Sequence, residues 1–499
     1  MGAKLKFMKQ KLLIITAIIG ISPTLYSFCG FYVSKADGGL KNKTSQVILV
    51  REGNRNVITM YNDFKGDSKD FAMVVPVPVV LKKNDIHVVD PSIFKRLNDY
   101  SAPRLVEYYD QNPCYGYEAG DKVMESASRA LNGVVPGLSI KKEKDLGVKI
   151  EAQYLVGEYD ILILSAKESN GLKEWLNDNG YKIPKGAEEV LDPYIKSNLK
   201  FFVVKVNENE KKKLSNNFLR PIQINFNSPK FMLPIRLGMA NADGDQDLIV
   251  YAFTAKGRVE CTNYRNVDMP TGKNIPLFVQ KNFAAFYSNL FTHQWENENK
   301  NIGMLEYAWD VSPQNFVKCD PCVATAPDQR DLVQAGVFWL QKDWADYSDT
   351  EEEDVDYTVS NNVYFTRLHF RYNRKSFPQD LSFQVTPNRE NFQARYIITH
   401  PATGDLSCDA GKRYLQELKK RRRNELKELT TLTGKDISSW QDDVAAGDEE
   451  MNNKEVVYSA LLKESKENNS GSDNSTAGIL LLSMAVTGVA GLMKWKGMM

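Results

Sequence analysis

In this chain of 499 residues, three groups have residue types and spacings that occur in redox, metal-binding or anion-binding sites. In the first, Cys319 and Cys322 form a C-x-x-C pair, which is the spacing of thiol redox sites and of half of many zinc sites. No second C-x-x-C and no nearby histidine pair completes a zinc cage, and Asp320-Pro321 suits a loop better than the start of a helix. We therefore expect a structural disulfide, within the pair or to Cys408 or Cys261, with redox chemistry as the alternative.

The second group, Asp243-Gly244-Asp245-Gln246-Asp247, has the alternating carboxylates that begin a calcium-binding loop. Its sixth position is Leu248, where such a loop needs glycine, and its twelfth is Thr254, where glutamate is needed. A hairpin turn before a strand explains the same residues. We therefore predict no metal site here.

The third group lies on an expected strand from Thr366 to Tyr372, where alternate side chains point to opposite faces. One face would carry the row Arg367, His369 and Arg371, which could bind an anion or an acidic group of a partner. Ordinary polar alternation on a solvent-exposed face is the alternative interpretation. The other histidines are too scattered to predict a metal centre.

The common motifs of catalysis and nucleotide binding do not occur in the chain. It has no G-x-S-x-G element, phosphate loop, dinucleotide fingerprint or H-E-x-x-H helix. The formal net charge of +1 gives no support to nucleic-acid binding. We predict no catalytic, cofactor-binding or metal-binding residue, although these motifs do not cover catalysis by residues that meet only in space.

The N-terminus has the pattern of a secretory signal peptide. Four lysines precede the apolar run Leu12 to Ile21, whose length of about ten residues suits a signal-peptide core rather than a membrane span. Ser27 is a small residue that suits cleavage, so we assign residues 1–28 to the signal peptide. An uncleaved anchor and a lipoprotein acylated at Cys29 are the alternatives.

The C-terminus has the pattern of a membrane anchor behind a linker. Residues 436–476 end in a polar stretch rich in Gly, Ser and Asn, and 477–493 are apolar and uncharged. These last residues would form a helix of roughly 25 Å, at the lower edge of what spans a bilayer core. Lys494 and Lys496 place the tail at 494–499 in the cytoplasm. Removal of the tail by a sorting enzyme is the alternative.

Residues 29–435 would then be extracytoplasmic, with a subdomain break near 140–150. Short β-branched and aromatic runs separated by turns, with isolated helices, predict an α+β fold of largely antiparallel sheets between the signal helix and the transmembrane helix. Gly53-Asn54 predicts a hairpin turn, and Lys256-Gly257 predicts a second one that pairs Leu248–Phe253 with Arg258–Thr262. Six cysteines in an exported chain can form up to three disulfides.

Two helices are expected from apolar periodicity. The first covers Ser92 to Asp110 and is interrupted at Pro103. The second covers Ala410 to Leu432, with leucines on one face and the basic run Lys419 to Arg423 on the other. A basic helix could touch anionic lipid. A solvated outer face is the alternative that we favour.

Several runs together resemble one family of bacterial exported proteins, the family catalogued as domain of unknown function 2330. They are Asp70 to Pro78, Ser101 to Arg104, Tyr159-Asp160-Ile161 with Leu172, Trp175, Leu176 and Gly180-Tyr181, Cys319 to Cys322, Thr366 to His369, Phe377 to Leu381, Asn391 to Tyr396 and His400-Pro401. The resemblance extends from Cys29 to about Thr433. It implies an exported bacterial protein and brings no established activity. Family members often have a second cysteine soon after the first, and its absence after Cys29 leaves the partner of Cys29 open.

These features favour an uncharacterised extracytoplasmic protein of the bacterial cell envelope, tethered by its C-terminal helix. We expect it to bind an envelope protein, a peptide or a glycan, or to be structural, without catalytic activity. The alternative is an envelope enzyme, either a hydrolase with a dispersed site or a thiol oxidoreductase that uses Cys319 and Cys322.

Overall fold

The computed structural model describes residues 31–32, 44–61, 72–115, 147–179, 187–214, 219–240, 244–314, 324–341, 361–444, 458–459 and 461–462. The predicted signal peptide, the apolar segment at 477–493 and the tail after it lie outside these ranges, as do Cys319 and Cys322. Within the described ranges, no helix is long and apolar enough to cross a membrane.

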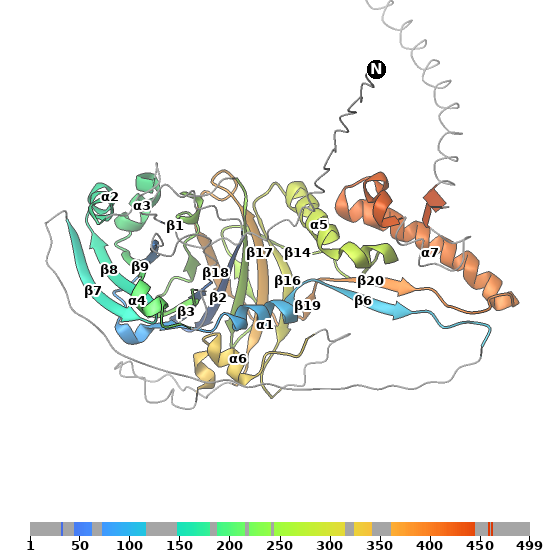
Figure 1. The fold of residues 1–499 in the computed structure, drawn as a ribbon, viewed down its shortest axis with the longest axis horizontal. Coiled ribbons are helices and arrows are strands. Elements are labelled where there is room, and N and C mark those ends of the chain that lie inside the picture. Colours follow the sequence, from blue (N-terminus) through green and yellow to red (C-terminus); the bar gives the residue numbers. More distant parts are fainter. Residues whose placement is uncertain are drawn as a thin grey trace, which may run out of the picture.

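A nine-stranded sheet forms the centre of the molecule (Figure 1). Its neighbouring strands run antiparallel except that β12 pairs with β2, and β14 with β16, in parallel. In sheet order the strands are β14 (Arg265–Asp268), β16 (Ile302–Asp310), β17 (Tyr364–Tyr372), β12 (Gln246–Thr254), β2 (Thr44–Glu52), β3 (Arg55–Met60), β10 (Ile222–Asn227) and β5 (Ile86–Val88), with β19 (Phe392–Gln393) beside β16. The predicted turn at Gly53 is confirmed, because it joins β2 to β3 with a positive φ of 54°.

A second, antiparallel sheet of five strands packs on the nine-stranded sheet. Its strands, in sheet order, are β1 (Phe31–Tyr32), β4 (Ala72–Val77), β9 (Lys200–Val206), β8 (Tyr159–Ala166) and β7 (Val148–Val156). Apolar side chains from both sheets form one shared core, in which Val47 and Val250 of the large sheet join Val75 and Ile161 of the small one. Strands on both sides of the predicted break near 140–150 therefore lie in one sheet.

Helices cover the outer faces of these two sheets (Figure 1). α2 and α3 pack on the five-stranded sheet, while α1 and α6 pack on the nine-stranded one. The helices are α1 (Ser92–Ser101), α2 (Ser169–Asp178), α3 (Ala187–Lys196), α4 (Glu208–Lys211), α5 (Phe283–Asn297), α6 (Gln329–Gln334) and α7 (Asp409–Thr433). Short 3₁₀ turns are η2 (Lys83–Asp85), η3 (Gly238–Ala240), η4 (Leu277–Asn282), η5 (Phe338–Leu340) and η7 (Ile437–Trp440).

Two small sheets complete the fold. The strands β11 (Met232–Leu233), β18 (Leu381–Val385) and β13 (Val259–Cys261) pair antiparallel. The strands β15 (Lys273–Asn274), β20 (Arg395–His400) and β6 (Arg104–Tyr109) pair in parallel and form an extension beside α7. The predicted α+β class is confirmed. The structure departs from the largely antiparallel arrangement that we expected in this parallel sheet and in the parallel pairs β12–β2 and β14–β16.

Two local predictions are wrong for reasons that lie outside the local sequence. The expected hairpin between residues 248 and 262 does not form, because β2 and β17 occupy both edges of β12 and β13 pairs with β18 instead. The expected helix after Pro103 is the strand β6, which pairs with β20. The helix before it ends at Ser101, since proline disfavours the helical conformation in the residue that precedes it.

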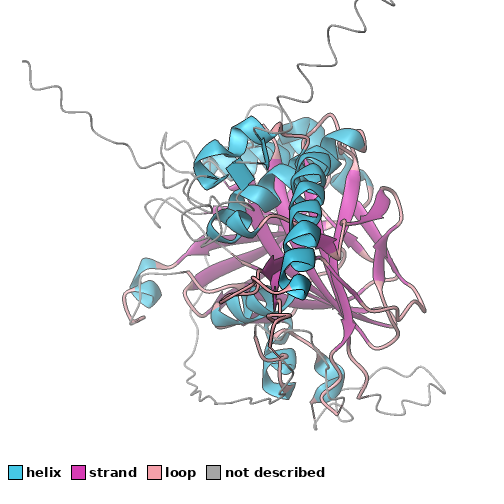
Figure 2. Ribbon diagram, turned by 90° about the vertical axis from the view of Figure 1, so that its right-hand side faces the viewer, coloured by secondary structure: helices cyan, strands magenta, loops and turns pink. Residues whose placement is uncertain are grey.

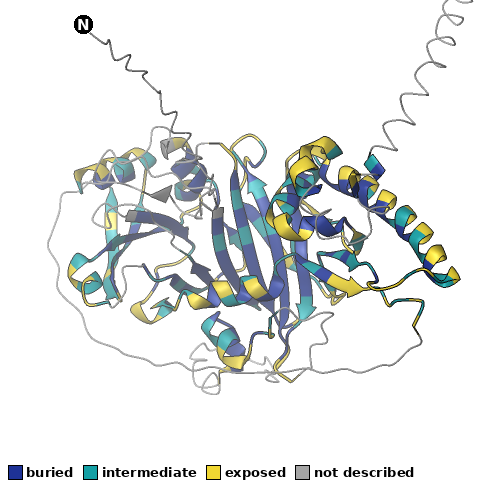
Figure 3. Ribbon diagram, turned by 45° about the vertical axis from the view of Figure 1, so that its right-hand side comes forward, coloured by how far each residue is buried: buried dark blue, intermediate teal, exposed yellow. Residues whose placement is uncertain are grey.

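Helix α7 confirms the prediction for residues 410–432 and extends it by one residue at each end. Leu418, Leu426, Leu429 and Leu432 are buried, as the periodicity predicts, and Gly434 ends the helix in the left-handed conformation. Figure 2, seen from the right-hand side of Figure 1, shows this long helix in front of the strands, and Figure 3 shows that its outer face is exposed. Three side chains within the expected linker, Trp440, Val444 and Tyr458, pack in the same apolar core as the leucines of α7, and Leu461 is buried as well.

Candidate functional site

The predicted row on β17 lies on one face of the nine-stranded sheet. Leu368, Phe370 and Tyr372 point into the core between the two sheets, so the alternate residues Arg367, His369 and Arg371 point to the opposite face. That face is not open to solvent. The Arg367 side chain is only 4% exposed and that of His369 only 12%, so exposed polar alternation is the wrong explanation for the row.

A β-bulge in β16 brings a carboxylate to the row. The register between β16 and β17 shifts between Leu305 and Tyr307, which leaves Glu306 as the extra residue. A bulge re-aims side chains, because two successive residues then oppose one residue of the partner strand. The carboxylate of Glu306 is therefore fully buried and lies among polar groups, although its strand is otherwise mostly apolar.

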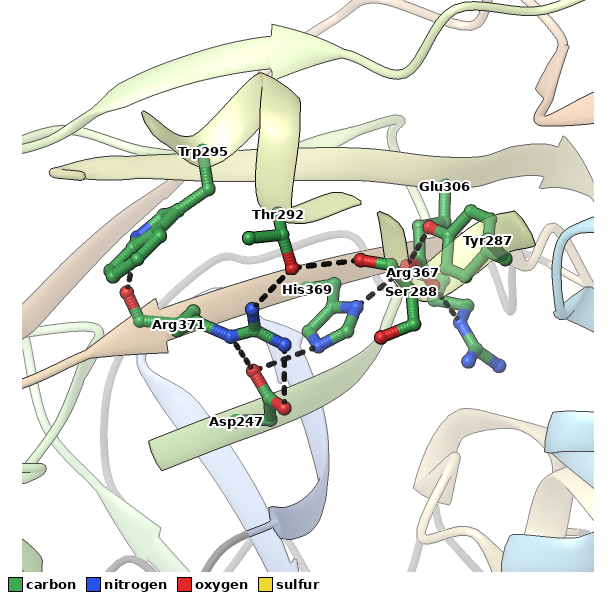
Figure 4. A network of polar contacts seen from close by, with 9 residues as sticks. All are labelled: Asp247, Tyr287, Ser288, Thr292, Trp295, Glu306, Arg367, His369 and Arg371. Carbon is green, nitrogen blue, oxygen red and sulfur yellow. Dashed lines mark hydrogen bonds and ion pairs between the residues drawn. The ribbon is translucent and has the colours of Figure 1, made fainter. Parts of the chain in front are cut away.

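Five charged side chains form one network on this face (Figure 4). Glu306 Oε2 accepts from Arg367 Nε at 2.5 Å, and Glu306 Oε1 lies 2.7 Å from His369 Nδ1. Asp247 accepts twice from Arg371, at 2.7 and 3.1 Å, in a bidentate pair. His369 Nε2 lies 3.6 Å from Asp247 Oδ1, which is an ion-pair distance and too long for a hydrogen bond.

Helix α5 covers the network with aromatic rings. Phe291 stacks on His369, with ring centroids 4.0 Å apart. The Arg371 guanidinium lies 4.8 Å from the centre of the Phe291 ring and 5.6 Å from that of Trp295. Such cation–π contacts add stability where water is excluded. The charged row is therefore the surface on which α5 packs.

Polar groups of α5 and α1 complete the network. The Tyr287 hydroxyl donates to Glu306 Oε1, and Arg371 donates to Thr292 Oγ1 at 2.9 Å. On the side of α1, Arg367 donates to Asn98 Oδ1 at 3.0 Å. The network therefore joins both helices to the strands beneath them.

The charges of the network shift one another's pKa values. Burial acts to raise the pKa of Glu306, but Arg367 and His369 outweigh it and lower this pKa to about 2. Burial likewise opposes ionisation of Asp247, and His369 and Arg371 lower its pKa to about 2. Burial acts to lower the pKa of His369, yet the two carboxylates raise it above 6.5. The two carboxylates therefore favour the cationic form of the imidazole between them.

A histidine between two carboxylates is an arrangement that general acid–base chemistry uses. Here, however, every one of these groups is engaged with another part of the same chain. The anion-binding role of Arg367, His369 and Arg371 remains a prediction, and in this structure Glu306 and Asp247 of the same chain are the anions that they hold.

The carboxylates are the part of the network that sequence reasoning missed. Asp247 was assigned to a turn, whereas it lies on β12 directly opposite Arg371 on β17. Glu306 is the only charged residue before the final aspartate in the strand IGMLEYAWD, and a lone acid within an apolar strand was the available signal. Among the described residues, no group of His, Cys, Asp and Glu could hold a metal ion, and Asp243 lies outside them.

The disulfide pairing of Cys408 and the state of Cys261 differ from the sequence prediction. Cys408 forms a disulfide with Cys114, with the two Cα atoms 6.1 Å apart, so it is not the partner of Cys319 or Cys322. Cys261 is a free, buried thiol, so the proposed bond to it is not formed either. A disulfide within the Cys319–Cys322 pair, and the redox alternative, concern residues that the structure does not describe.

The disulfide lies at the end of the parallel sheet, in a region that we call the tip and define as residues 107–115 together with 400–408. Tyr109 is 66% exposed and stacks on His400, with ring centroids 4.3 Å apart. Tyr115 is also 66% exposed. Three of the five large exposed hydrophobic side chains in the described ranges belong to the tip, the third being Tyr108.

The tip is held rigidly. Its Glu107 contacts His400 Nε2 at 2.9 Å, and its Asp110 accepts the hydroxyl of Tyr414 at 2.7 Å and pairs with Arg421 of α7. Near this contact, an open groove of about 420 Å³ runs between α7 and the β15 strand. Its lining residues are Gly272, Lys273, Asn274, Glu417, Lys420, Arg421, Asn424, Glu425 and Glu428.

Comparison with known proteins yields a family and no function. No curated protein and no solved structure matches the chain. A family model does match residues 23–384, and its description is "Uncharacterized protein conserved in bacteria (DUF2330)". The match ends before β20 and α7, whereas the resemblance seen in the sequence extended to about Thr433. Because the match covers well over half of the chain, this protein belongs to the bacterial DUF2330 family.

Proposed function

We propose that this protein is exported from a bacterial cell, stays tethered to the membrane by its apolar segment at 477–493, and binds another envelope component without catalysing a reaction. The component would be an envelope protein, a peptide or a glycan. The observation that carries the proposal is the set of exposed tyrosines at the tip, Tyr108, Tyr109 and Tyr115.

Tyrosine suits a binding surface for a physical reason. Its ring offers a large rigid contact area, its hydroxyl keeps a hydrogen-bonding group, and little conformational entropy is lost when it is buried. Aromatic side chains are therefore enriched among the residues that contribute most to binding energy. At the tip, the stacking of Tyr109 on His400 and the nearby Cys114–Cys408 disulfide hold the surface in place before binding.

The disulfide also supports export. It joins residues 294 positions apart, and disulfides of this structural kind form and persist in oxidising compartments outside the cytoplasm. The lysine-rich, apolar N-terminus supports the same conclusion. Deleting residues 477–499 tests the tether, because the shortened protein should leave the membrane fraction. Its continued presence in that fraction would contradict tethering by this segment.

Site-specific crosslinking tests the binding surface. A photoreactive amino acid placed at Gln111, an exposed residue of the tip, should give discrete adducts in native envelopes. The same group at Lys83, an exposed residue of η2, should not. The double variant Y109A/Y115A should abolish the adducts from position 111. Equal adducts from both positions, or adducts unaffected by the double variant, would refute binding at the tip.

An envelope hydrolase is the second candidate, because the Glu306–His369–Asp247 arrangement contains acid and base groups in contact. The observation against this site is its engagement with α5, whose Phe291 ring lies on the imidazole. A hydrolase that used it would lose activity when His369 is replaced by asparagine in a protein whose stability is retained. A hydrolytic activity that survives H369N would have to come from another site.

A further inference from the structure

The outer face of α7 carries a stripe of cations. Arg413, Lys420 and Lys427 are exposed and follow one another at intervals of seven residues. Positions seven residues apart on an α-helix differ in direction by only about 20°, so the three side chains lie along one line of the helix surface. The ion pairs that α7 forms with described residues involve other side chains. The charges of this stripe are therefore available to a partner outside the fold.

The structure corrects which residues form the basic face that the sequence predicted. Arg422 is only 1% exposed, and its guanidinium carbon lies 4.4 Å from the ring centroid of Tyr458. Arg421 lines the groove and pairs with Asp110. The exposed charged residues of α7 are the cations Lys412, Arg413, Lys420, Arg423 and Lys427 and the acids Asp409 and Glu417. Five cations less two acids leave the face with a surplus of three positive charges.

The chain that follows α7 keeps the helix close to the proposed membrane anchor. The Tyr458 hydroxyl donates to Glu425 of α7 at 2.7 Å, and Leu462 packs against the same apolar core. The apolar segment begins at Ala477, 15 positions after Leu462. A chain of this length spans at most about 50 Å even when fully extended, and an α-helix with its side chains is about 10–12 Å thick. An inserted segment therefore holds every face of α7 within reach of the bilayer surface.

The chemistry of this face suits lipid headgroups better than a protein. Anionic phospholipids attract Lys and Arg within a Debye length, which is about 8 Å at physiological ionic strength. None of the large exposed hydrophobic side chains in the described ranges belongs to α7. A protein interface usually contains aromatic anchors, which this face lacks. The same lack means that the helix would lie on the headgroups by charge, without inserting an apolar face.

We propose that the outer face of α7 docks on the anionic phospholipid surface of the membrane that holds the chain, with Arg413, Lys420 and Lys427 against the headgroup phosphates. This inference rests on the proposed tether and adds a second membrane contact to it. The tip ends at Cys408, the residue that caps the start of α7. Docking of the helix therefore holds the tip near the bilayer, where its tyrosines meet partners at the same surface.

Photocrosslinking of the full chain to lipid tests this proposal. The chain is reconstituted in vesicles of phosphatidylcholine alone or of an equal mixture of phosphatidylcholine and phosphatidylglycerol, and a photoreactive amino acid replaces Gln416, an exposed residue of α7. Mass spectrometry should find phospholipid adducts at position 416 in the mixed vesicles and far fewer in the neutral ones. Salt at about 1 M, where the Debye length is about 3 Å, should remove them. The same group at Lys83 on η2 should give none.

Matched variants assign the adducts to the stripe. R413Q/K420Q/K427Q should lose most of them, because three cations near an anionic surface strengthen docking on the order of a hundredfold. K83Q/K212Q/K230Q removes three exposed lysines outside α7 and should behave like the wild type. Equal adducts in neutral and anionic vesicles, or adducts that survive in R413Q/K420Q/K427Q, would overturn the proposal. Should that variant fail to fold, the lipid and salt dependence of the wild type decides alone.

Flotation of the same vesicles separates this proposal from the tether. A chain that floats with both kinds of vesicle but gives no adducts at position 416 is tethered without docking α7, which refutes the contact. A chain that floats only with anionic vesicles, and no longer floats as R413Q/K420Q/K427Q, docks through α7 although the apolar segment does not hold it. Flotation with neither kind of vesicle contradicts both the tether and the docking of α7.

Discussion

Replacing His369 by phenylalanine tests most directly whether the charge network holds α5 on the sheet. Phenylalanine keeps a ring that can stack on Phe291 but removes the bond to Glu306 and the positive charge beside Asp247. Both carboxylates keep an arginine, since Glu306 is paired with Arg367 and Asp247 with Arg371. The variant should therefore fold and lose a defined part of its stability.

The size of the loss follows from what each carboxylate retains. A hydrogen bond to a charged group contributes about 1.5–3 kcal/mol, and removing one partner of a buried pair costs about 3–5 kcal/mol when it leaves a charge uncompensated. Glu306 still accepts from Arg367 and Tyr287, so the lower range applies. We expect H369F to reduce the free energy of unfolding by about 2 kcal/mol.

The loss should depend on pH in a stated direction. The pKa of His369 is raised above 6.5 in the folded protein, so its stabilising effect is complete below pH 6.5 and disappears as the pH rises through the raised value. The pKa values of Glu306 and Asp247 are lowered to about 2, from 4.5 and 3.8, so their effect persists in mild acid and is lost as the pH falls towards about 2. The difference between wild type and H369F should be largest below pH 6.5 and smaller in base.

Denaturant unfolding of the wild type and H369F across this pH range measures the difference. H87F is the control, because His87 lies on β5 and is exposed. It should change the stability little and without this pH dependence. An H369F protein as stable as the wild type below pH 6.5, or a loss that stays constant as the pH rises, would show that the histidine charge does not secure α5.

Three further predictions follow from single contacts. Replacing Gly434 by alanine should lower the stability by at least about 1 kcal/mol, because φ is 62° and an added Cβ would meet the ring of His293, and thermal unfolding measures the loss. Removing the disulfide with C114S or C408S should cost about 2–5 kcal/mol, and reductant should lower the melting temperature of the wild type but not of the variants. Burial raises the pKa of the Cys261 thiol, so a thiol reagent such as iodoacetamide should modify it only after unfolding; rapid alkylation of the native protein would contradict its burial.

Several elements could be predicted because they depend on near neighbours in the chain. Gly53 closes the first hairpin, since a turn with positive φ favours glycine. The leucines of α7 repeat with helical spacing, so both its bounds and its buried face could be read within one turn. Strand alternation likewise placed Arg367, His369 and Arg371 on one face of β17. Membership of the family could be recognised because its motifs are short and contiguous.

The contacts of these side chains depended on strand pairing between segments that are far apart in the sequence. Glu306 reaches the row through a bulge in β16, and Asp247 reaches it because β12 pairs with β17 more than a hundred residues away. The same reason applies to Cys114 and Cys408, which are 294 residues apart, and to β6, whose partner β20 turns an expected helix into a strand. Strand order and register decide such contacts, and they result from packing the whole core.

By itself, the sequence determined the α+β class, the family, and the local faces of β17 and α7, because side-chain periodicity and turn residues are local properties. Only the tertiary structure decided that the predicted anion-binding row is enclosed under α5 and that Arg422 is buried instead of solvated. The physical reason is the same in both cases. Burial and charge pairing depend on which distant element covers a face, and local spacing carries no information on that.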